Sequence, residues 1–290
     1  AFIESKLGIN FGVWYSEDAK IRATGAADDM LASLKEKDLL YEKDGAVWLK
    51  TSEYDDGEDQ VVVRSDETKS YFIADIFYHN EKFARGFGKA LDVWGADHHG
   101  HVKRMHAAGK MLGWPEGEPH IFITQMVALK EDGESKKMSK RAGNVILLED
   151  LVDELGIDVV RWFFLEKSLS SHMEFDMALA RERSAKNPVF YVQYAHARIA
   201  SIVRNAAGAV EKNDGSLTEL LANLSARALA GKIATFPEVV SDIAQNYEVQ
   251  RLPTYTYELA ALFSQFYRDV RVIDEGKVNG AALALASLTK

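Results

Sequence analysis

Two lysines three residues apart, Lys137 and Lys140, stand in the segment Gly133-Glu134-Ser135-Lys136-Lys137-Met138-Ser139-Lys140-Arg141-Ala142-Gly143-Asn144. Glycines flank the lysines and the hydroxyl of Ser139 lies between them, so the segment can bend around a polyphosphate. A lysine ammonium is a mobile point charge that can follow phosphate charge as it develops in a transition state. Charge alone favours a solvated basic loop, because short motifs also match by accident. The sequence on either side must decide between these interpretations.

Upstream of this loop, from residue 2 to about residue 147, short β-rich runs alternate with helical patterns, which predicts an α/β fold. The pair Asp44-Gly45 favours a tight hairpin between two of the runs. Strands are expected over residues 39–41, 46–49, 61–64, 90–94 and 120–129, and a helix over residues 71–83.

Downstream, after Leu148, strand patterns almost vanish and three apolar stripes follow at helical spacing, the third of which includes Tyr267. Asn187-Pro188 is a good helix start, a capping side chain followed by a ring with its φ preset. Ser216 and Glu219 form a capping box for a second helix. A helix-bundle core explains the stripes better than a cofactor site. We therefore expect an α/β part over residues 1–184, followed by an all-α part over residues 185–290.

The composition is that of a soluble globular protein: 290 residues, 47% hydrophobic and 27% charged. The chain has no cysteine, which excludes disulfides and thiolate metal sites and fits a cytoplasmic protein. Its apolar runs are all shorter than a membrane span. The formal net charge of −9 does not exclude a nucleic-acid partner, because one basic patch can bind phosphates on an acidic protein.

A second polar run, Gly95-Ala96-Asp97-His98-His99-Gly100-His101, follows the strand expected over residues 90–94. Ligands of open α/β sheets gather at the carboxyl ends of strands, so this position favours a nucleotide site. Asp97, His99 and His101 could instead bind a metal, although nothing in the pattern fixes a ligand geometry and we expect no metal site. Ordinary surface or helix-start histidines are the third interpretation.

The order of the motifs around both runs resembles the arginyl-tRNA synthetase family of class I aminoacyl-tRNA synthetases. Residues 137–141 resemble the KMSKS signature of class I enzymes, and residues 94–100 resemble the W-G-A-D-H-H-G run of arginyl enzymes. Three further segments carry the resemblance. Residues 71–79 (Y-F-I-A-D-I-F-Y-H) resemble the family's Y-F-x-x-D-I-A-Y-H stretch, and residues 156–161 (G-I-D-V-V-R) resemble its D-A-L-R element. Residues 187–198 (N-P-V-F-Y-V-Q-Y-A-H-A-R) resemble its N-P-V-Y-Y-V-Q-Y-A-H-A-R run. The letters H-x-G-H at residues 98–101 are interpreted as a chance match, since that class I signature opens the first half of the fold.

The resemblance implies roles for named side chains. Tyr71 and Asp75 are four residues apart, so on a helix they share one face. There a carboxylate can pair with a guanidinium in bidentate fashion; without the resemblance, an amphipathic surface helix would be the preferred explanation. The implied roles are phosphate contact by Lys137, Ser139 and Lys140, arginine recognition by Tyr71 and Asp75, ATP contact by Gly95, Asp97, His98, Gln125, Met126 and Val127, and tRNA contact by Tyr194 and Arg198.

By resemblance, the chain is the second part of a class I Rossmann-like catalytic domain followed by a helical DALR-type anticodon-binding bundle. The implied partners are tRNA(Arg), L-arginine and ATP with Mg²⁺, with the protein expected to be a cytoplasmic monomer. Because the genuine H-x-G-H half is absent, we expect this chain alone not to activate arginine. Two alternatives stay open: a tRNA-binding module without chemistry, and a cysteinyl or methionyl enzyme. The Tyr71–Asp75 pair and the lack of cysteine zinc ligands speak against the second.

Overall fold

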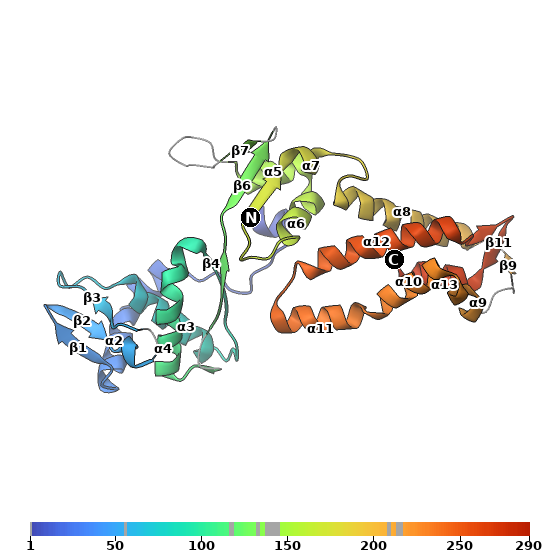
Figure 1. The fold of residues 1–290 in the computed structure, drawn as a ribbon. Coiled ribbons are helices and arrows are strands. Elements are labelled where there is room, and N and C mark those ends of the chain that lie inside the picture. The colour runs from blue at the N-terminus through green and yellow to red at the C-terminus, as the bar shows by residue number, and fades with distance from the viewer. Residues whose placement is uncertain are drawn as a thin grey trace. The chain divides into compact units, whose positions relative to one another are not determined.

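The computed structural model describes residues 2–54, 57–115, 119–131, 134–136, 146–207, 210–212 and 217–290, and Figure 1 shows the elements they form. The chain divides into two compact units, which are described separately. The first unit holds residues 8–126 and 169–172, and the second holds residues 1–7, 127–168 and 173–290.

The first unit begins with a helical turn and a small antiparallel sheet. Its elements in order are η1 (Asp18–Arg22), α2 (Ala26–Glu36), β1 (Leu40–Lys43), β2 (Ala46–Leu49), η2 (Thr51–Tyr54) and β3 (Gln60–Val63). The sheet has the strand order β1-β2-β3. Asp44 and Gly45 have φ values of 54° and 74°, the left-handed backbone that a two-residue hairpin of the favoured type needs. The predicted hairpin is therefore confirmed, with Lys43 opposite Ala46.

The rest of the first unit alternates helices and parallel strands. These elements are α3 (Tyr71–Ala84), β4 (Leu91–Gly95), η3 (Ala96–His101), α4 (Val102–Leu112) and β5 (His120–Thr124). The helix expected over residues 71–83 is confirmed as α3. β4 and β5 pair in parallel from Leu91 opposite His120 to Gly95 opposite Thr124. Both carboxyl ends therefore lie at the same edge of this two-stranded sheet.

The single strand expected over residues 120–129 is wrong, because the run forms two strands, β5 and β6 (Val127–Glu131). The break falls at Gln125 and Met126, where the backbone N–H of Gln125 donates to the carbonyl of Leu169 at 3.0 Å. A partner that distant in sequence cannot be read from local hydrophobicity.

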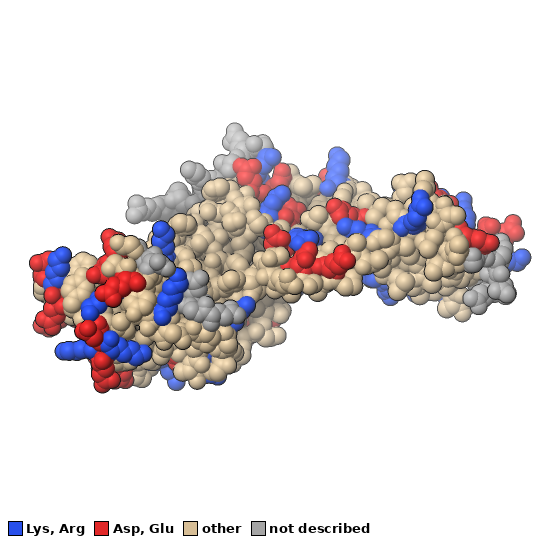
Figure 2. Space-filling view, turned by 60° about the horizontal axis from the view of Figure 1, so that its bottom comes forward, with Lys and Arg blue, Asp and Glu red and all other residues tan. Residues whose placement is uncertain are grey.

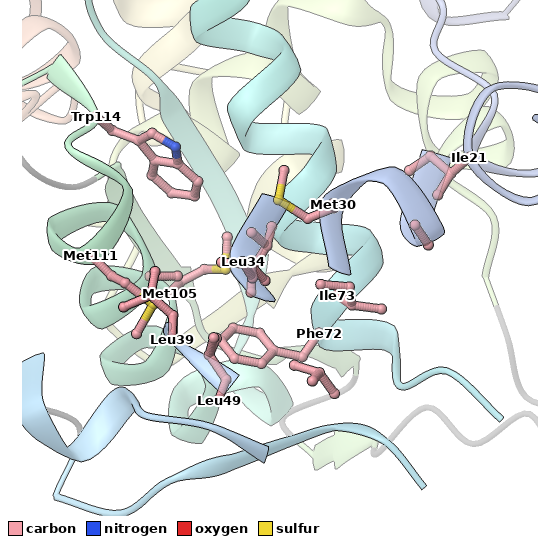
Figure 3. Packing of buried hydrophobic residues seen from close by; sticks show 14 residues of the cluster. Ile21, Met30, Leu34, Leu39, Leu49, Phe72, Ile73, Met105, Met111 and Trp114 are labelled. Atoms are coloured by element: carbon pink, nitrogen blue, oxygen red, sulfur yellow. The ribbon is translucent and has the colours of Figure 1, made fainter. Parts of the chain in front are cut away.

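The core of the first unit lies between α2, α3, α4 and the β1-β2-β3 sheet (Figure 3). Phe72 and Ile73 of α3 meet Leu34 of α2 and Met105 of α4, and Leu49 of β2 closes the cluster. All five side chains are buried. Each buried side chain of this size contributes about 1.5–3 kcal/mol relative to an exposed one. The burial of Phe72 and Ile73 fixes which face of α3 is left for solvent.

The first part of the second unit contains a small sheet and several short helices. Its elements are α1 (Phe2–Ser5), β6, β7 (Glu134–Lys136), α5 (Leu148–Leu155), α6 (Ile157–Leu165), β8 (Met173–Asp176) and α7 (Met177–Arg181). The sheet has the strand order β7-β6-β8, in which β6 and β8 are parallel. Leu129 of β6, Phe175 of β8 and Phe163 of α6 lie in one buried cluster.

The remainder of the second unit is mostly helical, as expected. Its elements are α8 (Pro188–Ala206), β9 (Val210–Lys212), α9 (Leu217–Ala222), α10 (Leu224–Ala234), α11 (Phe236–Asn246), α12 (Arg251–Asp269), β10 (Ile273–Asp274), β11 (Lys277–Asn279) and α13 (Gly280–Leu288). The predicted cap of α8 is confirmed, since the Asn187 side chain accepts from the Val189 N–H at 3.0 Å. The small sheet of β9, β10 and β11 was not expected from the sequence.

The apolar run after the expected capping box forms two helices rather than one. Ser216 lies outside the described residues. α9 ends at Ala222, and Asn223 begins α10 by accepting from the N–H groups of Ser225 and Ala226. An asparagine favours such a cap over a helix interior, which explains the break. In the described part of the chain, no helix combines the length and the apolar composition needed to cross a membrane.

Candidate functional site

The residues predicted to recognise arginine lie at the start of α3. Tyr71 is its first residue and Asp75 lies one turn later, so the expectation that both belong to one helix face is confirmed. Tyr71 is 70% exposed and the Asp75 side chain is 43% exposed. A cleft of about 410 Å³ beside Tyr71 is lined in part by Glu17, Arg22 and Arg64. The side chains of Tyr71 and Asp75 are therefore both accessible to a ligand, and Asp75 lies outside the lining of this cleft.

The Asp75 carboxylate has one neighbour that the sequence did not reveal. Its Oδ2 lies 3.0 Å from Nε2 of His101, the last residue of η3. The His101 ring packs edge-on against Phe72, with ring centroids 5.4 Å apart, and it lies 5.5 Å from the ring of Trp94. The sequence placed His101 in the polar run of residues 95–101, but that pattern did not identify Asp75 as its partner.

A buried polar network anchors the same turn of α3. Nδ1 of His79 donates to the carbonyl of Asp75 at 2.8 Å, and Nε2 lies 2.8 Å from Oδ2 of Asp92. Lys82 donates to Oδ1 of Asp92 at 2.7 Å. The His79 side chain is only 3% exposed. Both ring nitrogens of His79 therefore have an oxygen atom within hydrogen-bond distance.

The electrostatics of this network centre on Asp92 in β4. Burial by itself would raise the pKa of Asp92, but the hydrogen bonds and charges of His79 and Lys82 together lower that pKa below its usual value. A buried carboxylate that accepts from two cationic groups is satisfied at both oxygens. The network therefore joins α3 to β4 by charge as well as by apolar packing.

The candidate nucleotide residues follow the aligned ends of β4 and β5. Gly95 ends β4 opposite Thr124, whose Oγ1 donates to the carbonyl of Trp94 at 2.9 Å. Asp97 and His98 of η3 follow one strand end, and Gln125 and Met126 follow the other. Asp97 and His98 are both exposed, and Met126 is 74% exposed. The parallel pairing thus places five of the six predicted ATP contacts at or directly after one sheet edge.

Gly95 also matters for the position of Asp97. A β-carbon at residue 95 would lie 2.7 Å from Oδ1 of Asp97, so the carboxylate folds back over space that only glycine leaves free. His101 turns to Asp75 rather than to the rest of its own run. Among the described residues, no three histidine, aspartate or glutamate side chains gather as a metal ion would require.

The remaining predicted ATP contacts lie in the second unit or outside the described residues. Val127 begins β6 and pairs with Met173 of β8. Lys137, Ser139 and Lys140 fall outside the described residues, which resume at residue 146. Their assignment to ATP phosphates stays a prediction.

The predicted tRNA residues Tyr194 and Arg198 lie one turn apart on α8. The Arg198 guanidinium is 4.7 Å from the ring centre of Tyr194 and 4.6 Å from that of Tyr267 on α12. It also donates to the Tyr194 hydroxyl. A cavity of about 530 Å³ opens here, with Asn205 and Arg271 also in its lining. The sequence misassigned Tyr267 to a core stripe; its ring is partly exposed and faces Arg198.

Figure 2 shows how charged side chains are distributed over one face of the protein. On the face shown in Figure 2, the described lysine and arginine side chains lie among acidic ones. Attraction of a polyanion to this face therefore depends on local groupings of basic side chains more than on a broad positive field.

Two families match the chain. Residues 5–203 match the family described as tRNA synthetases class I (R), catalytic domain. Residues 192–290 match the DALR anticodon binding domain. The catalytic-domain match covers more than half of the chain and spans α3, η3 and the strand ends described above.

Curated relatives are named as arginine–tRNA ligases. The chain is 45% identical over 290 residues to the protein of Symbiobacterium thermophilum, an alignment that covers 98% of this chain and 51% of that relative. It is 44% identical over 287 residues to the protein of Thermotoga maritima, covering 98% and 52% respectively. The chain thus spans about half the length of the curated relatives it matches.

Two solved structures are similar to this chain. A structure from Campylobacter jejuni, provisionally assigned as an arginyl-tRNA synthetase, superposes with a TM-score of 0.82 at 35% identity, covering 98% of this chain and 62% of that one. The arginyl-tRNA synthetase of Thermus thermophilus has a TM-score of 0.71 at 20% identity, covering 91% and 55%, which shows a shared fold.

These findings agree with the α/β elements of the first part of the chain and the helical bundle of the last part. The matched catalytic family is specific for arginine, which removes the cysteinyl and methionyl alternatives raised by the lysine loop. The chain belongs to the arginyl-tRNA synthetase family, with class I catalytic-domain elements followed by a helical DALR domain.

Proposed function

We propose that the protein containing this chain is an arginine–tRNA ligase, which activates arginine with ATP and transfers it to tRNA(Arg). The observation that carries the proposal is the half-exposed Asp75 carboxylate one turn from the exposed phenol of Tyr71. A carboxylate can receive a guanidinium through two parallel hydrogen bonds, and a phenol can add a third or cover the alkyl chain. This pair suits arginine better than a neutral or acidic amino acid.

In the first step, the arginine carboxylate attacks the α-phosphorus of ATP. A carboxylate oxygen–phosphorus bond forms, the bond from that phosphorus to the β-phosphate oxygen breaks, and pyrophosphate leaves. Catalysis is then mainly positioning and stabilisation of negative charge. We assign that charge stabilisation to Lys137, Ser139 and Lys140, together with the Mg²⁺ that accompanies ATP as part of the substrate.

The nucleoside of ATP is assigned to the edge where β4 and β5 end. Gly95, Asp97 and His98 are proposed at the ribose, and Gln125, Met126 and Val127 at the adenine ring. The exposure of Asp97 and of Met126 supports an open position for a ligand at this edge. In the second step, a hydroxyl of the terminal tRNA ribose attacks the arginyl carbonyl, and AMP leaves.

The helical part is proposed to bind tRNA. Arg198 lies between two tyrosine rings that line an open cavity. Aromatic rings stack on unpaired bases and a guanidinium contacts phosphate or stacks in turn, which suits a single-stranded loop. We place the division between the catalytic and anticodon-binding parts near residues 184–185, and we propose that the protein acts as a cytoplasmic monomer.

A second proposal concerns the chain taken alone. It spans about half the length of the relatives, and its sequence offers no H-x-G-H segment before α3. We propose that residues 1–290 alone do not activate arginine. A tRNA-binding module without chemistry is the competing function, supported by the match of residues 192–290 to an anticodon-binding family.

Aminoacylation of tRNA with labelled arginine tests both proposals. The assay compares the 290-residue chain with the protein encoded by its gene together with any upstream coding sequence. Charging by the longer protein only, and with arginine rather than cysteine or methionine, supports the ligase and the inactivity of the chain alone. If neither charges tRNA while the chain still binds it, the binding-module function replaces the ligase.

A further inference from the structure

We propose that His101 is a positioning residue for the arginine substrate, because its Nε2–H holds the Asp75 carboxylate in the orientation that receives a guanidinium. The contact is 3.0 Å from Nε2 to Oδ2. This inference rests on the proposed function, since it assumes that Asp75 meets the arginine side chain.

The protonation of the contact follows from its chemistry. An ionised carboxylate only accepts hydrogen bonds, so the Nε2 atom of His101 must carry the hydrogen. One lone pair of Oδ2 is then used, while the other lone pair and both of those on Oδ1 stay available. A guanidinium can therefore still dock on both oxygens, and the carboxylate plane is already set before it arrives.

The His101 ring is itself held in place by packing, so it can fix the orientation of the Asp75 carboxylate. Its side chain is 18% exposed, and its ring packs edge-on against Phe72, which belongs to the buried core. The ring of Trp94, the residue before the last of β4, is also close, with ring centroids 5.5 Å apart. His101 also lies at the junction of η3 and α4. Its position is thus fixed by two helical elements and a strand end.

Asp75 is consequently held at two points by two histidines. His79 donates to its main-chain carbonyl at 2.8 Å, which fixes the backbone of the turn. His101 binds its side chain at 3.0 Å, which fixes the rotation of the carboxylate. A half-exposed aspartate without the second contact would sample several rotamers, and ordering it would fall to the substrate. Fixing it beforehand lowers the apparent dissociation constant for arginine.

The test uses aminoacylation kinetics on the protein as its gene encodes it, with His101→Phe and His101→Gln. Phenylalanine keeps a ring against Phe72 and Trp94 but donates nothing. Glutamine keeps an N–H donor near the same reach. The matched controls are His99→Phe and His99→Gln, since His99 is an exposed histidine of the same run.

We expect His101→Phe to raise the KM for arginine by about three- to tenfold, because the substrate must then order the Asp75 side chain on binding. The KM for ATP and kcat should stay within about twofold, and His101→Gln should recover most of the arginine KM. Equal losses for arginine and ATP, or an unchanged arginine KM, would overturn the inference. Failure of the unmodified protein to charge tRNA with arginine would instead overturn the proposed function.

Discussion

The turn of α3 that contains Asp75 and the cavity lined by Arg198 differ in how their side chains are held. Around Asp75, buried His79 and partly buried Lys82 tie the helix to the buried carboxylate of Asp92 in β4 at distances of 2.8 and 2.7 Å. Around Arg198, the contacts are two tyrosine ring faces beside an open cavity. A small substrate with a planar charged end group rewards a preset geometry, whereas a flexible polynucleotide rewards a surface that accepts several stacking arrangements. The difference predicts different responses to mutation.

The largest expected effect is on kcat/KM for arginine. Asp75→Asn removes the charge that would meet the guanidinium, so kcat/KM for arginine should fall by roughly a hundredfold or more in the full-length protein. The KM for ATP should change little. Asp29→Asn, at an exposed aspartate of α2 in the same unit, is the control. Unchanged arginine kinetics in Asp75→Asn would remove the distinction between the two regions.

The next effect is on stability rather than catalysis. Asp92→Asn leaves buried His79 and partly buried Lys82 without their common carboxylate, which should lower the free energy of unfolding by about 3 kcal/mol. Urea unfolding followed by circular dichroism measures it. Asp153→Asn, in a pair with Lys6 whose side chains are 58% and 50% exposed, should change stability by less than about 1 kcal/mol.

The same aspartate predicts a pH dependence. The pKa of Asp92 is lowered in the folded state, so its stabilising contribution is complete above the ordinary carboxyl pKa of about 3.9. That contribution should be lost as the pH falls through the lower folded value. Asp92→Asn should remove this part of the acid sensitivity. Identical acid unfolding profiles for the two proteins would contradict the assignment.

A smaller effect is expected at the cavity lined by Tyr194 and Tyr267. Arg198→Gln should weaken tRNA binding by about three- to tenfold, because part of the stacking platform remains in Tyr194 and Tyr267. The arginine KM should be unchanged. Fluorescence anisotropy with labelled tRNA gives the affinity, and Arg227→Gln on α10 is the exposed control. A loss of arginine affinity without a loss of tRNA affinity would reverse the proposed roles of the two regions.

The smallest effect belongs to a helix cap in the bundle. Asn223→Ala removes the side chain that accepts from Ser225 and Ala226, so unfolding free energy should fall by about 1 kcal/mol. Asn223→Asp, which keeps an acceptor, should restore it. Thermal unfolding distinguishes the variants. Equal destabilisation by both substitutions would show that the cap contributes little to the bundle.

Local chemistry explains what could be predicted from the sequence. The turn at Asp44-Gly45, the α3 helix and the Asn187 cap each depend on residues close together in the chain, and each was found. The overall order of an α/β part and a helical part followed from periodicity in the same way.

Other features depend on partners far away in sequence. The break at Gln125 depends on Leu169, and the Asp75–His101 contact joins residues separated by 26 positions. Strands β9, β10 and β11 are only two or three residues long, too short to show an alternating pattern. The Tyr267 ring was assigned to the core because helical spacing identifies an apolar stripe, not which of its members remain partly exposed.

The parallel pairing of β6 with β8 sets an order of events on the ribosome. β6 can join β7 at once, because they are neighbours in the chain, but Val127 pairs with Met173 in β8. At translation rates of about 5–20 residues per second, the intervening segment takes roughly 2 to 9 s to emerge. During that interval the edge of β6 that pairs with β8 has no partner strand, while α5 and α6 have already been synthesised and can fold. The pairing of β6 with β8 therefore cannot begin until synthesis has delivered β8, whatever the rest of the sheet has already formed.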